Sequence, residues 1–388
     1  MKSQARDAMV EWLNIGPGNP SSLHFEGQRA KRKIDESREI IAEQLGCLFG
    51  EVLFTSSGTE AANHAILGLA NSSTSGNRKK IIMSAVEHHC ALATRDRLLQ
   101  MGYELLIAPV NRAGKIELEQ FKTSLDESVL LVCIMHCNNE LGTYQPMKEI
   151  IDLAHHVGAF VFMDAVQSFQ IPDEFGLPWD IKTLPADMVS ISGHKIGGPA
   201  GTGALYVRSG LKIDPLIYGG GQEREMRGGT EAIANIIGFS TAAKFLADNS
   251  KRLVCRNAFV KQLTSLSPTV LRSIPTHPGI AHFMCPYPIA ESALIALDQR
   301  GISAASGAAC ASGSIEPSHV LLACGFSKSE ANSGLRFSLG DAFSDQEIRS
   351  AATIVNQVIF ELADLHRNSH REQEASTNWP KIPVTPHV

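Results

Sequence analysis

DMVSISGHKIGG, at residues 187–198, is the stretch from which the fold can be read. Its first half is a short apolar run, and its second half is a glycine-rich turn that carries Lys195. A lysine beside such a desolvating core has a lowered pKa and can attack a carbonyl as a neutral amine. Taken alone, the four residues SGHK fit an ordinary surface turn equally well.

Similar short apolar runs recur on both sides of this stretch. They are continuous rather than alternating, which indicates strands buried on both faces of a largely parallel sheet. Helical patterns lie between them, and Gly46 follows one such pattern as a left-handed stop. An α/β fold is therefore predicted. We expect strands at 52–54, 79–83, 104–108, 129–135, 160–165, 187–192 and 204–208, and helices at 26–46 and 148–156.

The length of 388 residues exceeds what one hydrophobic core usually supports, so at least two domains are predicted. The pattern changes near residue 250, at the polar stretch DNSKR. We expect a large cofactor-binding domain over 1–250, with its first residues packed on the smaller domain. A smaller C-terminal α+β domain is expected over 251–370. The polar, proline-containing residues 371–388 are expected to form a flexible tail.

The composition excludes several classes of protein. Hydrophobic residues make up 44% of the chain and charged residues 19%, which is ordinary for a folded protein. The net charge of −5, without a long basic run, gives no footprint for nucleic acid. No apolar run has the length of a membrane span, and the start has no signal-peptide core. The expectation is a cytoplasmic protein with a small-molecule substrate and no metal.

An acidic residue ends the strand expected at 160–165. The carboxyl ends of parallel strands are where open sheets bind ligands, and Asp164 is placed there. A buried carboxylate can hold a pyridinium proton, and Lys195 ends a neighbouring strand. Together they predict pyridoxal phosphate. The hydroxyl-rich stretch TSSGTE at 55–60, between a strand and a helix, could hold its phosphate, although such residues also make ordinary helix caps.

An ordered series of motifs runs over nearly the whole chain, and it resembles a cysteine desulfurase of the NifS/IscS type, within the class V pyridoxal-phosphate-dependent aminotransferases. The segment around Cys310 is the most specific part, and it resembles the desulfurase group whose cysteine lies on a long loop. The motifs are GNPSSLH (18–24), FTSSGTEAAN (54–63), EHH (87–89), MHCNNELG (135–142), DAVQS (164–168), SGHK (192–195), GGGQEREMRGGT (219–230), SGAACASGSIEPSHVL (306–321) and LRFSLG (335–340).

The resemblance implies the residues that bind the cofactor. Lys195 would hold it covalently and move protons at the substrate Cα, and Asp164 would pair with the ring nitrogen. His88 would stack on the ring, although a histidine in EHH is otherwise more often solvated. The resemblance places Asn139 and Gln167 near the phenolic oxygen. The phosphate would be held by Gly58, Thr59, Ser192, Gly193, His194 and, from a neighbouring subunit of a homodimer, Thr230.

The resemblance also implies the reaction. L-cysteine and an acceptor thiol would give L-alanine and a persulfide, with Cys310 as the attacking thiol and the other seven cysteines as inert core residues. Arg336 and Asn139 would bind the substrate carboxylate, although a strand arginine without the resemblance would be expected to pair at the surface. The sulfur would pass to an acceptor protein, either an iron-sulfur scaffold or a thiolation carrier.

The sequence departs from the family pattern in two places. It starts downstream of the D-N-A-T-T-like segment that lines the pocket in family members, so weaker activity is expected than with that segment. DAFSDQE follows LRFSLG where a segment containing aromatic residues is usual in the family, so Arg336 is expected to be held in place differently here. The alternatives are a selenocysteine lyase or other class V lyase, and a non-catalytic scaffold that docks sulfur acceptors.

Overall fold

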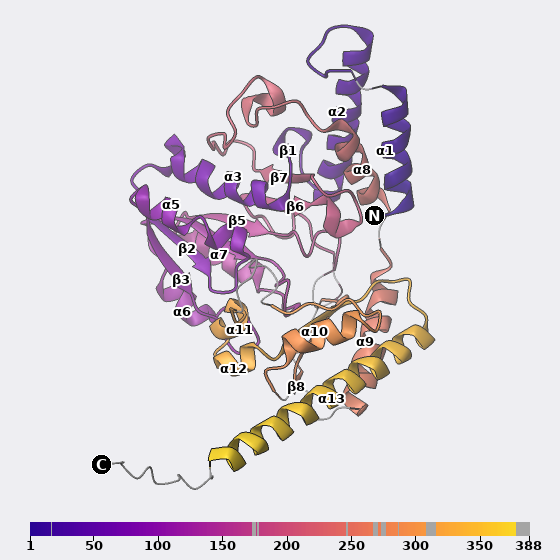
Figure 1. Cartoon of the computed structure of the whole chain (residues 1–388). Coiled ribbons are helices and arrows are strands. Elements are labelled where there is room, and N and C mark those ends of the chain that lie inside the picture. The colour runs from indigo at the N-terminus through magenta and orange to yellow at the C-terminus, as the bar shows by residue number, and fades with distance from the viewer. Residues whose placement is uncertain are drawn as a thin grey trace, which may run out of the picture. The chain divides into compact units, whose positions relative to one another are not determined.

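The computed structural model describes residues 1–16, 18–172, 176, 178–245, 247–266, 271–272, 277–285, 287–307 and 316–377 (Figure 1). The chain divides into two compact units. The first contains Met1–Ser250 and the short stretches around His277 and Cys324, and the second contains most of the residues from Lys251 onward. Across the described residues, no helix combines the length and apolar character that crossing a membrane requires.

The first unit is built on a seven-stranded sheet in the order β1-β7-β6-β5-β4-β2-β3. Neighbouring strands from β6 to β3 pair in parallel, and β7 runs against its neighbours β1 and β6. All seven expected strands are confirmed, and so is the α/β fold class. The strands are β1 (Val52–Thr55), β2 (Lys80–Ser84), β3 (Glu104–Ala108), β4 (Val129–Met135), β5 (Phe160–Asp164), β6 (Met188–Ser192) and β7 (Gly203–Val207).

Helices cover both faces of this sheet because alternate strand residues point to opposite sides. Val132 and Ile134 of β4 belong to a core with residues of α2, α7 and α8, whereas Leu131 and Cys133 belong to a core with residues of α3. The helices are α1 (Ser3–Ile15), α2 (Phe25–Leu45), α3 (Gly58–Asn71), α4 (His89–Leu92), α5 (Arg95–Gln100), α6 (Leu118–Thr123), α7 (Met147–His156) and α8 (Ile233–Lys244), with 3₁₀ turns η1 (Phe49–Glu51), η2 (Ser73–Ser75), η3 (Gly193–Ile196) and η4 (Gln222–Glu225).

One local expectation about the sheet differs from the structure. The strand β3 is at the edge of the sheet and is not buried on both faces, since Ile107 is 50% exposed. Within the first unit, α1 packs on α8. Gly238 makes this close approach possible: a Cβ there would lie 2.6 Å from the Met9 sulfur. The Lys2 N–H also donates to the Gly197 carbonyl at 2.7 Å.

The second unit has a three-stranded antiparallel sheet in the order β10-β9-β8 with helices around it. α13 continues to Thr377, whereas the sequence analysis placed a tail from residue 371; helix-forming Glu, Gln and Ala are frequent in this stretch. The elements are α9 (Asn249–Leu266), β8 (Leu271–Arg272), β9 (Ile280–Met284), α10 (Ala290–Asp298), α11 (His319–Ala323), α12 (Lys328–Ala331), β10 (Gly334–Ser338) and α13 (Asp345–Thr377).

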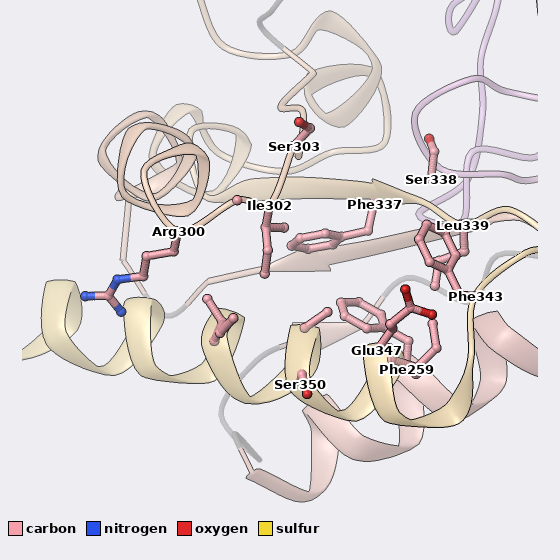
Figure 2. A pocket seen from close by; sticks show the side chains of 14 residues that line it. Phe259, Arg300, Ile302, Ser303, Phe337, Ser338, Leu339, Phe343, Glu347 and Ser350 are labelled. Atoms are coloured by element: carbon pink, nitrogen blue, oxygen red, sulfur yellow. The ribbon is translucent and has the colours of Figure 1, made fainter. Parts of the chain in front are cut away.

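A cavity of about 590 Å³ lies in the second unit between β10, the start of α13 and residues 300–303. Figure 2 shows Phe337 and Ile302 directed toward α13, with Arg300 and Glu347 at opposite sides of the view. Arg300 pairs with Glu361 at 2.6 Å. The cavity is therefore mainly apolar, and the charge of Arg300 in its lining is already paired with Glu361.

Aromatic packing in the second unit gives a stability prediction. Phe283 is fully buried, and its ring centroid lies 6.2 Å from that of Phe259 and 6.1 Å from that of Phe337. We expect Phe283→Ala to lower the free energy of unfolding of this unit by about 3–5 kcal/mol, because it leaves a cavity among the rings. Guanidinium unfolding would measure the loss. Phe360→Ala, at a side chain 65% exposed, is the control and should change little.

Candidate functional site

The candidate site lies where neighbouring strands of the large sheet end. β4, β5 and β6 run in parallel, so their carboxyl ends meet at one edge. Met135 pairs with Asp164 in register, and Asp164 pairs with Ser190. Lys195 follows β6 in η3. Ligands of open parallel sheets bind outside this edge, so the two predicted residues reach a position suited to chemistry.

Asp164 is the buried carboxylate of this site, with 6% of its surface exposed. Its Oδ1 accepts from the Val166 N–H at 2.9 Å and from the Ser190 hydroxyl at 3.1 Å. Burial raises its pKa, and the Val166 N–H, His88 and Lys195 act in the opposite direction. His88 and Lys195 are therefore both near enough to stabilise the negative charge. The structure brings together three residues that the sequence places far apart.

Lys195 is exposed, and the backbone on both sides of it is fixed. The Gly193 N–H donates to the Thr202 carbonyl at 3.1 Å, and Gly197 ends the turn with φ of 82°. The preceding Ser192 hydroxyl lies 2.8 Å from Nδ1 of His194. Burial and the charge of Lys195 lower the pKa of His194, which favours its neutral form. The lysine is thus held on a rigid turn while its amine stays accessible.

The beginning of α3 has backbone N–H groups that are suited to an anion. The Ser57 hydroxyl caps the helix by accepting from the Glu60 N–H at 3.1 Å. Within the described chain, the N–H groups of Gly58 and Thr59 donate to no protein acceptor. A Cβ on Gly58 would lie 2.5 Å from Val166 and 3.5 Å from Cβ of Ser192, so only glycine lets the helix approach β5 and β6 this closely. N–H groups at a helix start attract phosphate.

Three of the remaining predicted residues of the first unit lie on loops that follow strands, and Thr230 lies between η4 and α8. His88 is half-buried and caps α4, accepting from the Cys90 N–H at 3.1 Å. Asn139 is half-buried in a turn held by Asn138, whose Oδ1 accepts from two following N–H groups at 2.9 and 2.8 Å. The Gln167 carbonyl lies 3.2 Å from Nε2 of His277. Thr230 is exposed and lines a cavity with Trp12 and residues 231–235.

Two of the predicted residues belong to the second unit. Arg336 is in β10, and its backbone exchanges hydrogen bonds of 2.6 and 3.0 Å with Ala305. Burial and the neighbouring Arg336 lower the pKa of His282 to about 4, so this histidine is neutral beside the arginine. Cys310 lies outside the described residues.

Two residues beside Asp164 were not expected from the sequence. The Cys90 sulfur lies 3.9 Å from Oδ2 of Asp164. Glu87 is fully buried and accepts from the Met135 N–H at 2.7 Å. Burial raises the pKa of Glu87 well above its ordinary value, and Asp164 adds to this effect. The motif EHHC gave no signal of burial, because glutamate and histidine are usually surface residues.

These residues fit pyridoxal phosphate. The site offers a buried carboxylate for a ring nitrogen, an accessible amine for an aldehyde and unused N–H groups at a helix start for a phosphate. Gly58 is buried, and a buried N–H group normally has a partner, so its N–H is suited to a bound anion. Asp164, Lys195, Gly58 and Thr59 are the residues that would make these contacts.

Known proteins match this chain over most of its length. The aminotransferase class-V family profile matches residues 2–350. A cysteine desulfurase IscS from Methanosarcina thermophila is 36% identical over 372 residues, covering 94% of this chain and 91% of that protein. A solved NifS-like protein has a TM-score of 0.84 and 27% identity, covering 92% and 96%. The structure titled SspA in complex with cysteine has a TM-score of 0.78 and 32% identity, covering 88% and 96%.

The buried Glu87 gives a pH prediction. Its raised pKa means that, from about pH 4.5 upward, the unfolded chain releases this proton while the folded chain keeps it. Stability is therefore lost as the pH rises through that window. Glu87→Gln cannot ionise, so its unfolding free energy relative to the wild type should increase from pH 5 to pH 8. Denaturant titrations at both pH values would measure this; parallel pH profiles would contradict it. The exposed Glu104→Gln is the control.

Proposed function

Because this chain belongs to the aminotransferase class-V family, we propose that it is a pyridoxal-phosphate-dependent cysteine desulfurase. It converts L-cysteine and an acceptor thiol to L-alanine and a persulfide. The observation that carries the proposal is the placement of Asp164 and Lys195 at one sheet edge beside the open start of α3. This placement occurs in a chain that is 36% identical to a protein named cysteine desulfurase.

The resemblance to cysteine desulfurases assigns the residues that would hold the cofactor, and the placement of Asp164 and Lys195 supports this assignment. Asp164 would pair with the ring nitrogen, and Lys195 would provide the amine for the aldehyde. His88 would cover the ring, and Asn139 and Gln167 would lie near its phenolic oxygen. The phosphate is held by Gly58, Thr59, Ser192, Gly193 and His194. When bound, pyridoxal phosphate supplies an electron sink for charge that develops at the Cα of an amino acid.

The chain's own groups move the protons and orient the substrate. Lys195 takes and returns the proton at the substrate Cα, a role that suits an accessible amine next to Asp164. Arg336 and Asn139 bind the substrate carboxylate, for which the planar guanidinium provides two parallel donors. His88 would relay a proton to or from the substrate.

Cys310 carries the sulfur. Its thiolate attacks the substrate sulfur, a sulfur–sulfur bond forms, and the carbon–sulfur bond breaks with its electron pair going to carbon, which is then protonated to give alanine. The properties of the other cysteines support this assignment. Burial raises the thiol pKa of Cys47 and Cys285 to about 12 and that of Cys324 to about 11, and raises it also for Cys90, Cys133 and Cys137.

The enzyme acts as a homodimer in the cytoplasm and passes its persulfide sulfur to an acceptor protein. Two exposed residues of one segment are consistent with a dimer. Thr230 is exposed, and the side chain of Tyr218, twelve positions earlier, is 73% exposed. Leu13, at 56% exposure, lines the same cavity as Thr230. Apolar residues at such exposure are suited to burial against a second copy, whose phosphate site Thr230 would complete. The acceptor is an iron-sulfur scaffold or a thiolation carrier.

The lysine assignment can be tested by covalent trapping. We expect the purified protein to absorb visible light, and borohydride to fix the cofactor on the peptide that contains Lys195. Lys195→Ala should abolish this labelling, which peptide mass spectrometry would detect. Lys182→Ala, at an exposed lysine, should leave labelling intact. Cofactor fixed on another lysine in the Lys195→Ala protein would show that the assignment is wrong.

The sulfur carrier can be tested separately. Cys310→Ser should retain cofactor and bind cysteine yet form no persulfide, because a hydroxyl ionises far less near neutral pH than a thiol of pKa about 8.5. Mass spectrometry after incubation with cysteine should find one added sulfur on the wild-type peptide that contains Cys310. Cys47→Ser, at a half-buried cysteine, should keep turnover. Full turnover by Cys310→Ser would remove this residue from the mechanism.

A further inference from the structure

The segment 222–230 contains a strained turn outside the residues assigned above. Glu223, Arg224 and Glu225 follow one another with φ of 45°, 58° and 66°. Left-handed backbone is unfavourable for residues with a side chain, and three in succession are rare. Such strain persists only where the surroundings impose it. The contacts of this turn therefore indicate what it serves.

A buried ion pair anchors the turn to the sheet. Both oxygens of Glu223 accept from Arg38 of α2, at 2.7 and 2.8 Å, and the two side chains are 2% and 5% exposed. Glu223 also accepts from the Phe54 N–H in β1 at 2.9 Å. Breaking such a pair leaves an uncompensated buried charge, so the turn is fixed to the strand that leads into the start of α3.

A second ion pair connects the same segment to α3. Arg227 donates to both oxygens of Glu60, at 2.9 and 3.2 Å, with 21% and 9% of the side chains exposed. Glu60 also accepts from the Ser56 N–H at 2.9 Å and from the Ser56 hydroxyl. Burial would raise the pKa of Glu60, but the Arg227 and Ser56 bonds hold it below its ordinary value.

The position of Glu60 creates an electrostatic conflict. It is in the first turn of α3, next to the Thr59 N–H proposed to hold the phosphate. A carboxylate there would repel a phosphate bound at the same helix start, because like charges in a partly buried site interact strongly. The bidentate bond from Arg227 cancels that charge. The anchored turn holds Arg227 in place to do so.

We propose that Arg227, fixed by the Arg38–Glu223 anchor, is a positioning residue that neutralises Glu60 and thereby allows the start of α3 to bind the cofactor phosphate. This inference rests on the proposed function, because it takes pyridoxal phosphate as the ligand. Beyond that function, the affinity for the phosphate group is assigned in part to the Arg227–Glu60 ion pair, which lies outside the residues proposed to contact the phosphate.

The test compares two ligands in the full-length protein freed of cofactor. Pyridoxal phosphate and pyridoxal differ only in the phosphate, so the ratio of their dissociation constants measures the preference for it. Arg227→Gln should reduce this preference about tenfold or more, because Glu60 keeps its charge without a partner. Arg227→Lys, which keeps the charge but loses the bidentate bond, should give an intermediate value.

The double variant separates charge neutralisation from a merely structural role. Glu60→Gln combined with Arg227→Gln removes both charges, and it should restore the preference to within about threefold of the wild type. Equal weakening of both ligands by Arg227→Gln, or a double variant as weak as the single one, would overturn the inference. A wild-type protein that does not bind pyridoxal phosphate would instead contradict the proposed function.

A matched ion pair at the other end of the sheet is the control. Arg208 pairs with the buried Asp187 at 3.0 Å, just before β6 begins. Arg208→Gln should leave the phosphate preference unchanged. Glu223→Gln tests the anchor and should lower the preference while weakening the fold. Arg227 is partly exposed, so its variants are expected to fold. They therefore test the inference even if the Glu223→Gln protein does not fold.

Discussion

The burial of one negative charge, that of Asp164, is the constraint on which the site depends. A carboxylate out of water needs hydrogen bonds and nearby positive charge to stay ionised. The Val166 N–H and the Ser190 hydroxyl supply bonds, while Lys195 and His88 supply the favourable field. Burial raises the pKa of the neighbouring Glu87, and the charge of Asp164 adds to this effect, so the Glu87 carboxyl stays protonated. The positive charge of Lys195 and the negative charge of Asp164 therefore stabilise each other.

The site thus separates its charges along the sheet edge. Asp164, at the end of β5, provides the carboxylate for a cationic ring nitrogen, while the neighbouring Glu87 stays protonated and adds no charge. The start of α3 offers N–H groups suited to an anion, and its one acidic residue, Glu60, is neutralised by Arg227. A cofactor with a basic nitrogen at one end and a phosphate at the other matches this arrangement. The same arrangement would disfavour a ligand with the charges exchanged.

The features that the sequence could predict are those encoded by local pattern. Continuous apolar runs located all seven strands, and the carboxyl ends of those strands located Asp164 and Lys195. The packing of α1 on α8 was missed, because it depends on a glycine contact between segments more than two hundred residues apart. Glu87 and the Arg227–Glu60 pair were missed for the same kind of reason. Their burial and pairing are produced by tertiary contacts, and each residue alone resembles an ordinary surface charge.

The turn at 223–225 shows how such tertiary contacts can outweigh local preference. Glycines lie on both sides of it, at 219–221 and 228–229, yet the left-handed positions hold two glutamates and an arginine. Left-handed backbone costs roughly 1–2 kcal/mol for a residue with a side chain. A charged hydrogen bond contributes about 1.5–3 kcal/mol, and Glu223 accepts three bonds while Arg224 donates to the Gly50 and Val52 carbonyls at 3.1 and 2.8 Å. Glycine at these positions would remove the strain of the left-handed backbone, but it would also remove these hydrogen bonds. The side-chain hydrogen bonds therefore explain why residues other than glycine occupy this turn.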